Sequence, residues 1–414
     1  MGTSSKTHDH PWRTRSSFPY AETGHPPRVT ESRTPPWLTM GVEEEFLLVD
    51  TAGHLAANGP EVSDAVDDTV DEEAGQVDHE LRRCQVESAT PICTTADDVS
   101  TALCGLRDRL AAEAARHDLR LLPSGTAPLA DDRPPRLTPD SRYHRLARQL
   151  GVLAPEMLVC GTHVHIGIPD ESAGLMISNH VRPWLPVLLA LTANSPFHDG
   201  VDTGYASWRH ELGKRWPSAG APPHIESVDD YEARLAGLRK AGAVLDRGML
   251  YWDIRLSAHQ PTVEVRIADV VPTVAEAVML AVLVRAIANR ALAGETDCSS
   301  STLAPEVLRA RLWRSARDGL AGHCVDPRTG RLEPGWHVVD GLVDTVRPWL
   351  RSTGDDDVIG PTLAWLREVG TGADRQRAAF GRRARLTDVT DGLAWRGTTV
   401  DDRSPADPPD TCPT

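Results

Sequence analysis

The chain has 414 residues, of which 40% are hydrophobic and 25% are charged, as expected for a globular protein with a sizeable core. Acidic residues outnumber basic ones by 59 to 44, and the net charge of −15 gives no general attraction to nucleic acid or an anionic membrane. The cysteines include no CxxC pair, which argues against a thiolate zinc site.

In chain order, segments rich in β-branched or aromatic residues and bounded by Gly, Pro or Asp predict strands, and apolar residues at helical spacing predict helices. An acidic stretch without Lys or Arg, at 61–80, is interpreted as a solvated helical face, with a metal or partner site as the alternative. Clustered strands with helices between them indicate the α+β class. The elements are a strand at 40–50, a strand at 83–90, a helix at 96–117, a strand at 160–168, a helix at 230–245, strands at 251–257 and 262–269, and a helix at 274–292.

Composition also predicts the organisation of the chain. Residues 1–36 are rich in Pro, Ser, Thr and His and contain few aliphatic residues, so we expect a disordered extension. Residues 386–414 are expected to form a loosely ordered tail. Residues 37–385 contain no long linker and are predicted to form a single domain.

The first residues, MGTSSKTHDHPWRTRSSF, contain no apolar stretch of the kind that a secretory signal requires. The longest apolar runs, at 184–193 and 277–284, are shorter than the roughly 18 residues that a membrane helix needs. We therefore expect a cytoplasmic protein.

Four of the predicted strands carry polar side chains on one face. Residues i and i+2 of a strand project from the same face, so the residues between them can enter the core. The resulting polar pairs are Glu43 with Glu45, Gln85 with Glu87, His163 with His165, and Glu264 with Arg266.

If these strands lie side by side, four carboxylates share one face and repel one another unless a cation lies among them. Carboxylate oxygens with one or two nitrogens suit Mg²⁺, with Mn²⁺ as an alternative, whereas zinc usually recruits more His or Cys. Magnesium commonly bridges carboxylates to substrate phosphates, which points to a nucleoside triphosphate. Each pair also has an ordinary interpretation: an acidic surface run, histidines on a solvent-facing strand, or a cross-strand ion pair.

A further candidate is the segment 194–220, which is dense in Gly, Pro, Asp, Arg and Trp and shows little periodicity. Long irregular segments inside compact domains are commonly functional, and this one could serve as a lid. Arg209, Lys214 and Arg215 supply the positive charge that an anionic nucleotide or a carboxylate requires. The alternative is a structural loop held by Trp208 and Trp216.

With these residues in place, the chain resembles the carboxylate-amine ligase family of the glutamate-cysteine ligase 2 type, in the glutamate-cysteine ligase and glutamine synthetase-like superfamily. The resemblance extends from about residue 37 to residue 380. It depends on the motifs GVEEEFLLVD, QVESATP, GTHVHIGI, NSPF followed by DTGYASWR, RWPSAG, WDIRLSAHQPTVEVRIADV and GTGADRQRA, in that order.

The resemblance implies a curved, mainly antiparallel sheet with helices on its convex side and a concave face that binds ATP and magnesium. It also implies that ATP phosphorylates a substrate carboxylate and that an amine then captures the acyl phosphate. The expected substrates are glutamate and an amine such as cysteine, with no nucleic acid or membrane partner and with a homodimer as the candidate assembly. The implied metal ligands are Glu43, Glu45, Glu87, His163 and Glu264; the candidates for nucleotide binding are Glu43, Glu45, Gln85, His165 and Arg266; the catalytic candidates are Arg266, Arg209 and Arg215.

Two other functions are consistent with the residues alone. HxH on a strand also occurs at hydrolytic metal sites, so a metal-dependent hydrolase using His163 and His165 is the main alternative. A non-catalytic nucleotide-binding protein that retains the sheet is the third.

Overall fold

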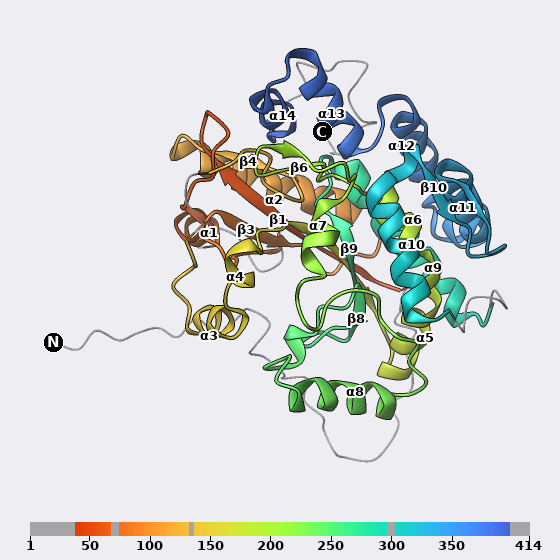
Figure 1. Cartoon of the computed structure of the whole chain (residues 1–414). Helices are drawn as coiled ribbons and strands as arrows, with labels where there is room; N and C mark the ends of the chain where they lie inside the picture. The colour runs from red at the N-terminus through yellow and green to blue at the C-terminus, as the bar shows by residue number, and fades with distance from the viewer. Residues whose placement is uncertain (1–37, 68–73, 132–135, 296–302, 398–414) are drawn as a thin grey trace, which may run out of the picture.

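The computed structural model describes residues 38–67, 74–131, 136–295 and 303–397 (Figure 1). Within these ranges, an antiparallel sheet of seven strands has the order β2-β3-β1-β5-β9-β8, and β4 pairs with β1 beyond the end of β3. Two short hairpins, β6–β7 and β10–β11, lie outside this sheet. The strands are β1 (Met40–Val49), β2 (Gln76–His79), β3 (Gln85–Ala89), β4 (Arg120–Leu122), β5 (Gly161–Gly167), β6 (Phe197–His198), β7 (Val201–Asp202), β8 (Ile254–Leu256), β9 (Thr262–Asp269), β10 (His323–Val325) and β11 (Leu332–Pro334).

Helices connect the strands and complete the second half of the chain. The α-helices are α1 (Gly59–Asp67), α2 (Ala96–Arg116), α3 (Ser141–Leu150), α4 (Leu153–Glu156), α5 (Glu171–Val181), α6 (Leu185–Leu191), α7 (Trp208–Gly213), α8 (Val228–Lys240), α9 (Val274–Leu292), α10 (Pro305–Asp318), α11 (Gly335–Thr353), α12 (Asp356–Val369), α13 (Gly372–Arg383) and α14 (Leu386–Leu393). Short 3₁₀ turns lie at Arg182–Trp184, Arg247–Met249 and Gly319–Ala321. The α+β class and the mainly antiparallel sheet are thus confirmed.

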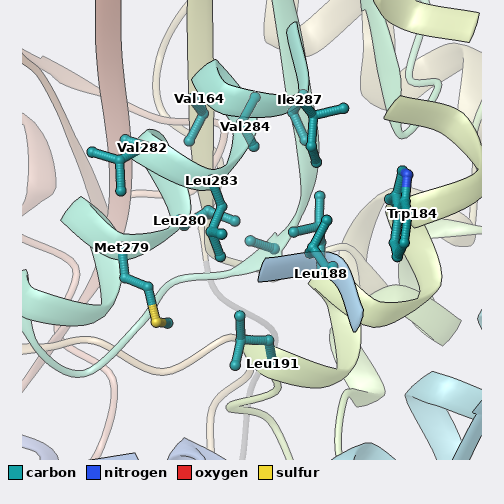
Figure 2. Packing of buried hydrophobic residues seen from close by; sticks show 14 of the residues in the cluster. Val164, Trp184, Leu188, Leu191, Met279, Leu280, Val282, Leu283, Val284 and Ile287 are labelled. Atoms are coloured by element: carbon teal, nitrogen blue, oxygen red, sulfur yellow. The ribbon is translucent and has the colours of Figure 1, made fainter. Parts of the chain in front are cut away.

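Helix α9 covers one face of the sheet. It begins at a capping box formed by Thr273 and Glu276 and is buried along almost its whole length. It packs against β1 and β5 and against helices α2, α5, α11 and α12. Figure 2 shows its aliphatic side chains beside Val164 of β5 and Leu188 of α6. Because this face of the sheet is covered by apolar side chains, the polar face is left to form a site.

A buried ion pair fastens the helices to β1. Glu44 lies on the opposite face of β1 from Glu43 and Glu45. Arg107 of α2 donates to Glu44 Oε2 at 2.8 Å and to Glu44 Oε1 at 2.5 Å. Arg107 also donates to the carbonyls of Val271 and Pro272, so it connects three parts of the chain. Both side chains are fully buried.

Two predictions about organisation need correction. Helix α14 lies inside the segment expected to be a loose tail, and its Val389 is fully buried in the cluster that contains Phe46. The ordered domain therefore extends past residue 385 to at least residue 397, because apolar side chains of this segment are buried in the hydrophobic core. Residues 1–36 and 398–414 lie outside the described residues.

The acidic stretch 61–80 is also not a single helical face. It contains most of α1 and all of β2, an edge strand of the sheet. Val62 and Val66 anchor α1 in the core, and Val77 does the same for β2. Residues 68–73 lie outside the described residues.

Among the helices that the structure describes, none combines the length and the apolar character needed to cross a lipid bilayer.

Candidate active site

The register of the sheet gathers the predicted polar residues on one face. Glu45 of β1 lies opposite Glu87 of β3, and Glu43 lies opposite His163 of β5. On the other side of β5, His165 lies opposite Glu264 of β9. A register irregularity between Thr162 and Val164 offsets β5 against β9 near His163.

A first group of possible metal ligands consists of Glu43, His165 and Glu264, whose ligand atoms all lie within 4.8 Å of one another. Glu43 Oε1 is 3.1 Å from His165 Nε2, and Glu43 Oε2 is 3.3 Å from His163 Nδ1. His163 therefore contacts Glu43 beside this group rather than within it. Thr262 fixes the His165 ring through a contact of 2.8 Å with Nδ1.

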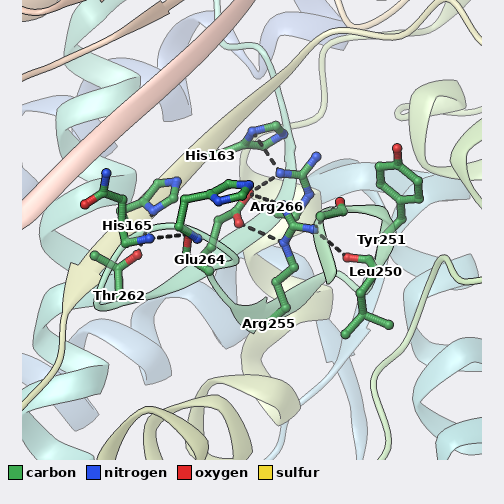
Figure 3. Close-up of polar contacts among 12 residues, drawn as sticks. His163, His165, Leu250, Tyr251, Arg255, Thr262, Glu264 and Arg266 are labelled. Carbon is green, nitrogen blue, oxygen red and sulfur yellow. Dashed lines mark hydrogen bonds and ion pairs between the residues drawn. The ribbon is translucent and has the colours of Figure 1, made fainter. Parts of the chain in front are cut away.

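Two arginines hold the Glu264 carboxylate (Figure 3). Arg255 of β8 donates through Nε to Glu264 Oε2 at 2.8 Å, and Arg266 donates to Glu264 Oε1. Arg255 also donates to the carbonyls of Gly248 and Leu250, so it fixes the neighbouring turn as well. Glu264 is 2% exposed, which shows why both positive charges are needed: a buried lone carboxylate would be costly.

A second group consists of Glu45, Glu80 and Glu87, whose ligand oxygens again lie within 4.8 Å of one another. Glu80 follows directly after β2 and is the last residue of the acidic stretch 61–80, for which a metal site was the alternative interpretation; it was not named among the individual site residues. Glu45 also accepts a hydrogen bond of 2.7 Å from the backbone N–H of Gly161. The acidic face thus divides into two groups, one with a histidine and one with carboxylates alone.

The two groups differ in electrostatics. Burial raises the pKa of Glu43, but the charge of His165 and hydrogen bonds with both histidines outweigh burial and leave that pKa well below its usual range. Burial and the charge of Glu80 raise the pKa of Glu45 to about 7. Burial and the charges of Glu43 and Glu80 raise the pKa of Glu87 well above normal. If all its carboxyl groups were ionised, the second group would therefore carry more negative charge than its surroundings balance.

The histidines also differ. Burial and the nearby Arg266 charge lower the pKa of His163 to about 4, so this ring is neutral at pH 7. Burial lowers the pKa of His165, but the Glu43 charge more than compensates, and the pKa lies above its usual value. Nε2 of His163 is buried without a hydrogen-bond partner in the described part of the chain, whereas Nε2 of His165 lies 3.1 Å from Glu43 Oε1.

These residues line a cavity of about 510 Å³. Its donor set, carboxylate oxygens with imidazole nitrogen, fits Mg²⁺ or Mn²⁺. A divalent cation would also neutralise the three closely spaced carboxyl groups of the second group, and the Nε2 atom of His163 is buried without a hydrogen-bond partner in the described residues. Gln85 also borders the cavity, although its side-chain amide donates to the carbonyl of Val159 at 2.8 Å.

The predicted arginines fall in different places. Arg266 borders the cavity, next to Glu264 and within 3.4 Å of His163 Nδ1. Arg209 also borders it and donates to the backbone carbonyls of Arg266 and Ile267. Arg215 instead pairs with Glu156 at the surface and is not part of the cavity wall.

Asp269 anchors the segment 194–220, which contains β6, β7 and α7 rather than one irregular loop. Its fully buried carboxylate accepts hydrogen bonds from Asn194 N at 2.8 Å, Ser195 Oγ at 2.7 Å and Ser207 Oγ at 2.8 Å. Ser207 is in turn the N-cap of α7. The segment forms a fixed wall of the cavity in this structure, and the Trp216 ring packs against Tyr251 in a tilted arrangement, with 4.5 Å between ring centroids.

The structure adds site residues that sequence reasoning missed. Arg255 and Asp253 alternate on the strand predicted at 251–257, so the i, i+2 rule could have found them. Glu80 and His210 belong to segments without a clear period, and only the fold brings them to the cavity.

Comparison with known proteins identifies the relatives of this chain. The profile of the family described as Glutamate-cysteine ligase family 2 (GCS2) matches residues 39–397. The chain is 48% identical over 372 residues to "Putative glutamate--cysteine ligase 2-1" of Rhodococcus jostii, covering 89% of this chain and 98% of that protein. It is 46% identical over 354 residues to the protein of the same name from Saccharopolyspora erythraea, covering 86% and 93%.

Two solved structures share the fold. The glutamate–cysteine ligase of Francisella tularensis, solved in complex with AMP, has a TM-score of 0.60 at 15% identity and covers 86% of this chain and 88% of that one. The bifunctional glutathione synthetase of Pasteurella multocida has a TM-score of 0.62 at 15% identity, with 86% of this chain covered. The present chain spans only about half, 52%, of the Pasteurella protein.

The family match and the fold together define an ATP-dependent carbon–nitrogen ligase with the glutamine synthetase-like fold. Within that class, the chain belongs to glutamate-cysteine ligase family 2.

Proposed function

We propose that this enzyme uses ATP to phosphorylate the side-chain carboxylate of glutamate and transfers the acyl group to an amine, with cysteine as the amine to test first. The observation that carries the proposal is the pair of acidic groups, Glu43 with His165 and Glu264, and Glu45 with Glu80 and Glu87, on one wall of a single cavity beside Arg266. The names of the relatives support glutamate and cysteine as substrates.

The acidic groups would hold Mg²⁺, or Mn²⁺ in its place, which when bound shields the triphosphate and the charge that develops on the transferred phosphoryl group. Arg266 would face the same phosphoryl group, because it extends from the strand that carries Glu264. Arg209 would add a second positive charge: no ion pair joins it to a carboxylate within the described residues. Such preorganised charges stabilise a transition state most strongly where water is excluded.

The rigid cavity wall serves the same chemistry. An acyl phosphate reacts with water unless the site keeps water away from it. The segment 194–220 is fixed to the end of β9 through Asp269, so Arg209 enters the cavity from an immobilised element. Gly161 makes this approach possible, because a Cβ at that position would overlap the Arg209 guanidinium.

The hydrolase alternative receives no support from these observations. A hydrolytic site would use His163 and His165 as joint ligands, yet the possible ligand groups in the described chain contain only His165. The family match is to ligases.

The decisive test follows labelled oxygen. Glutamate carrying ¹⁸O in its side-chain carboxylate is incubated with enzyme, ATP, Mg²⁺ and cysteine, and the released phosphate is analysed by mass spectrometry. Attack of the carboxylate on the γ-phosphate must transfer one labelled oxygen to each phosphate. A hydrolase would take this oxygen from water. Unlabelled phosphate alongside amide formation would refute the acyl phosphate.

A further inference from the structure

Two buried polar side chains border the cavity but belong to neither acidic group. Asp253 is 8% exposed and His210 is 5% exposed. Asp253 Oδ2 and His210 Nε2 are both buried without a hydrogen-bond partner in the described structure. A polar atom buried without a hydrogen-bond partner destabilises the folded protein. Two such atoms at one place therefore indicate that a bound ligand provides their hydrogen-bond partners.

The protein holds both residues in place. The backbone of Asp253 is fixed on two sides, since its N–H donates to the carbonyl of Gly220 at 3.0 Å and its carbonyl accepts from the N–H of Arg266 at 2.9 Å. His210 lies in α7, whose N-cap Ser207 is bound to Asp269. The two side chains therefore cannot easily move to find other partners.

They also do not satisfy each other. His210 Nδ1 and Asp253 Oδ1 are 3.9 Å apart, which is too far for a hydrogen bond. Burial and the charges of Lys214 and Arg209 lower the pKa of His210 to about 3, so the ring is neutral and gives Asp253 no positive charge. Burial raises the pKa of Asp253, and the charges of Arg209, Lys214 and Arg266, which favour its ionised form, do not outweigh burial. Lys214 is itself paired with Glu211 at 2.6 Å.

We propose that Asp253 and His210 form the subsite that binds the ammonium group of the amine substrate. The proposal rests on the proposed function and deepens it. A carboxylate with a free oxygen is the natural acceptor for an ammonium N–H, and a neutral imidazole nitrogen can accept a second one. Because Asp253 lies beside Arg266 on the neighbouring strand, an ammonium bound there is next to the acyl phosphate, whose phosphoryl group Arg266 would face.

The location also explains how the nitrogen becomes reactive. The bound ammonium passes one proton to Asp253 Oδ2, and its freed electron pair forms the C–N bond. The C–O bond to phosphate then breaks, and the phosphate leaves with the electron pair of that bond and takes up the second proton that the nitrogen loses as the amide forms. Burial raises the pKa of Asp253 to about 7, which suits a group that takes up a proton near neutral pH.

The test compares two nucleophiles in Asp253→Asn. Cysteine carries an ammonium group at pH 7, whereas hydroxylamine is largely uncharged, so it needs no counter-charge and no removal of a proton before it attacks. The one proton that it loses as the product forms can leave with the phosphate. We expect kcat/KM for cysteine to fall about 100-fold or more, as for the loss of a charge-assisted contact at a reacting atom, and the rate with hydroxylamine to change by only a few fold. His210→Gln should raise the KM for cysteine in the same selective way. Asp202→Asn, the same substitution on the surface hairpin β6–β7, is the control.

A partial reaction separates this inference from the proposed function. With glutamate but no amine, reversible phosphoryl transfer scrambles ¹⁸O between the bridging and non-bridging positions of labelled ATP. Asp253→Asn should retain this scrambling and the wild-type KM for glutamate. Equal losses with both nucleophiles, or a raised KM for glutamate, would overturn the amine subsite. Absence of scrambling in the wild-type enzyme would instead count against the acyl phosphate itself.

Discussion

Glu87 shows how a single carboxylate can oppose folding and still be retained. Burial and its acidic neighbours raise its pKa well above normal, and it lies in the group with Glu45 and Glu80. Its charge is therefore unfavourable in the protein without metal, and a bound divalent cation is what would make it favourable.

Glu87→Gln should consequently separate stability from activity. We expect the melting temperature without divalent metal to stay the same or rise, because Gln replaces a carboxyl group whose ionised form is unfavourable in the folded protein. We expect Mg²⁺ to raise the melting temperature of the wild-type protein and to raise that of the variant by less, and turnover should fall by about 100-fold, as for other preorganised electrostatic groups. Thermal melts with and without Mg²⁺ provide the measurement, and an unchanged Mg²⁺ effect would remove Glu87 from the ligand set.

Asp253 gives a prediction about pH. Its pKa is raised by burial from a usual value of 3.8 to about 7. The folded protein therefore binds this proton more tightly than the unfolded chain, and the stability that the proton provides is complete below about pH 4 and is lost as pH rises to about 7.

Asp253→Asn cannot ionise, so it should become more stable relative to wild type as pH rises from 4 to 7, with little further change above. One pKa unit corresponds to about 1.4 kcal/mol, so the difference should reach a few kcal/mol. Denaturant titrations of both proteins at several pH values measure it. A difference that is flat across this range would show that Asp253 is ionised in the folded state throughout.

Individual site residues also show how far the site could be predicted from the sequence. Alternation along a strand was enough to place Glu43, Glu45 and Glu87 on one face. It could not decide between His163 and His165 as the partner of Glu264, because the register irregularity in β5 is a property of strand pairing. Glu80 was missed because its position depends on where β2 ends, next to β3.

At the scale of the element, β1 carries two functions on its two faces. Glu43 and Glu45 point into the cavity, whereas Glu44 between them is fully buried against Arg107. An acidic triplet next to an apolar run therefore has a simple structural meaning: the outer residues serve the site, and the middle residue fixes helix α2 to the sheet.

Glu44→Gln tests this division. The variant leaves the Arg107 guanidinium buried without a counter-charge, and breaking such a pair typically costs about 3 to 5 kcal/mol. We expect a loss of this size in the free energy of unfolding, measured by denaturant titration, with kcat per folded molecule near the wild-type value at low temperature. Glu43→Gln is the matched comparison and should instead lower kcat. If Glu44→Gln reduced kcat in fully folded protein, the two faces of β1 would not be independent.

The position of the segment 194–220, unlike that of β1, could not be explained from its own sequence. Its composition predicted an irregular functional loop, and Arg209 does reach the cavity. What fixes the segment is Asp269, at the end of β9, through hydrogen bonds to residues more than sixty positions earlier in the chain. A contact of this kind depends on the folded topology, so local sequence could not reveal it.

At the scale of the whole molecule, the C-terminal helix α14 completes a hydrophobic core to which the strands of the sheet also contribute. Val389 and Leu393 of α14 lie in the same buried cluster as Phe46 and Val86. Trp395 follows the helix, and its backbone N–H donates to the carbonyl of Leu121 at 2.9 Å. Composition alone assigned this region to a loose tail because its few apolar residues are widely spaced.

Truncation at two positions would measure what this closure contributes. A chain ending at residue 397 keeps every described contact, whereas one ending at residue 385 loses α14 and Trp395, whose indole N–H donates to Asp108 Oδ1 at 2.8 Å. Burying a Val or Leu side chain stabilises a protein by roughly 1.5 to 3 kcal/mol, so the shorter chain should lose about 3 to 6 kcal/mol from those two side chains alone. Since a folded domain is stable by only about 5 to 15 kcal/mol, we expect a melting temperature many degrees lower or aggregation on expression.

Because α14 packs behind β1 and away from the cavity lining, any soluble fraction of the shorter chain should still bind Mg²⁺ and ATP. Equal melting temperatures for the two chains would mean that the sheet and α2 form a complete core without α14.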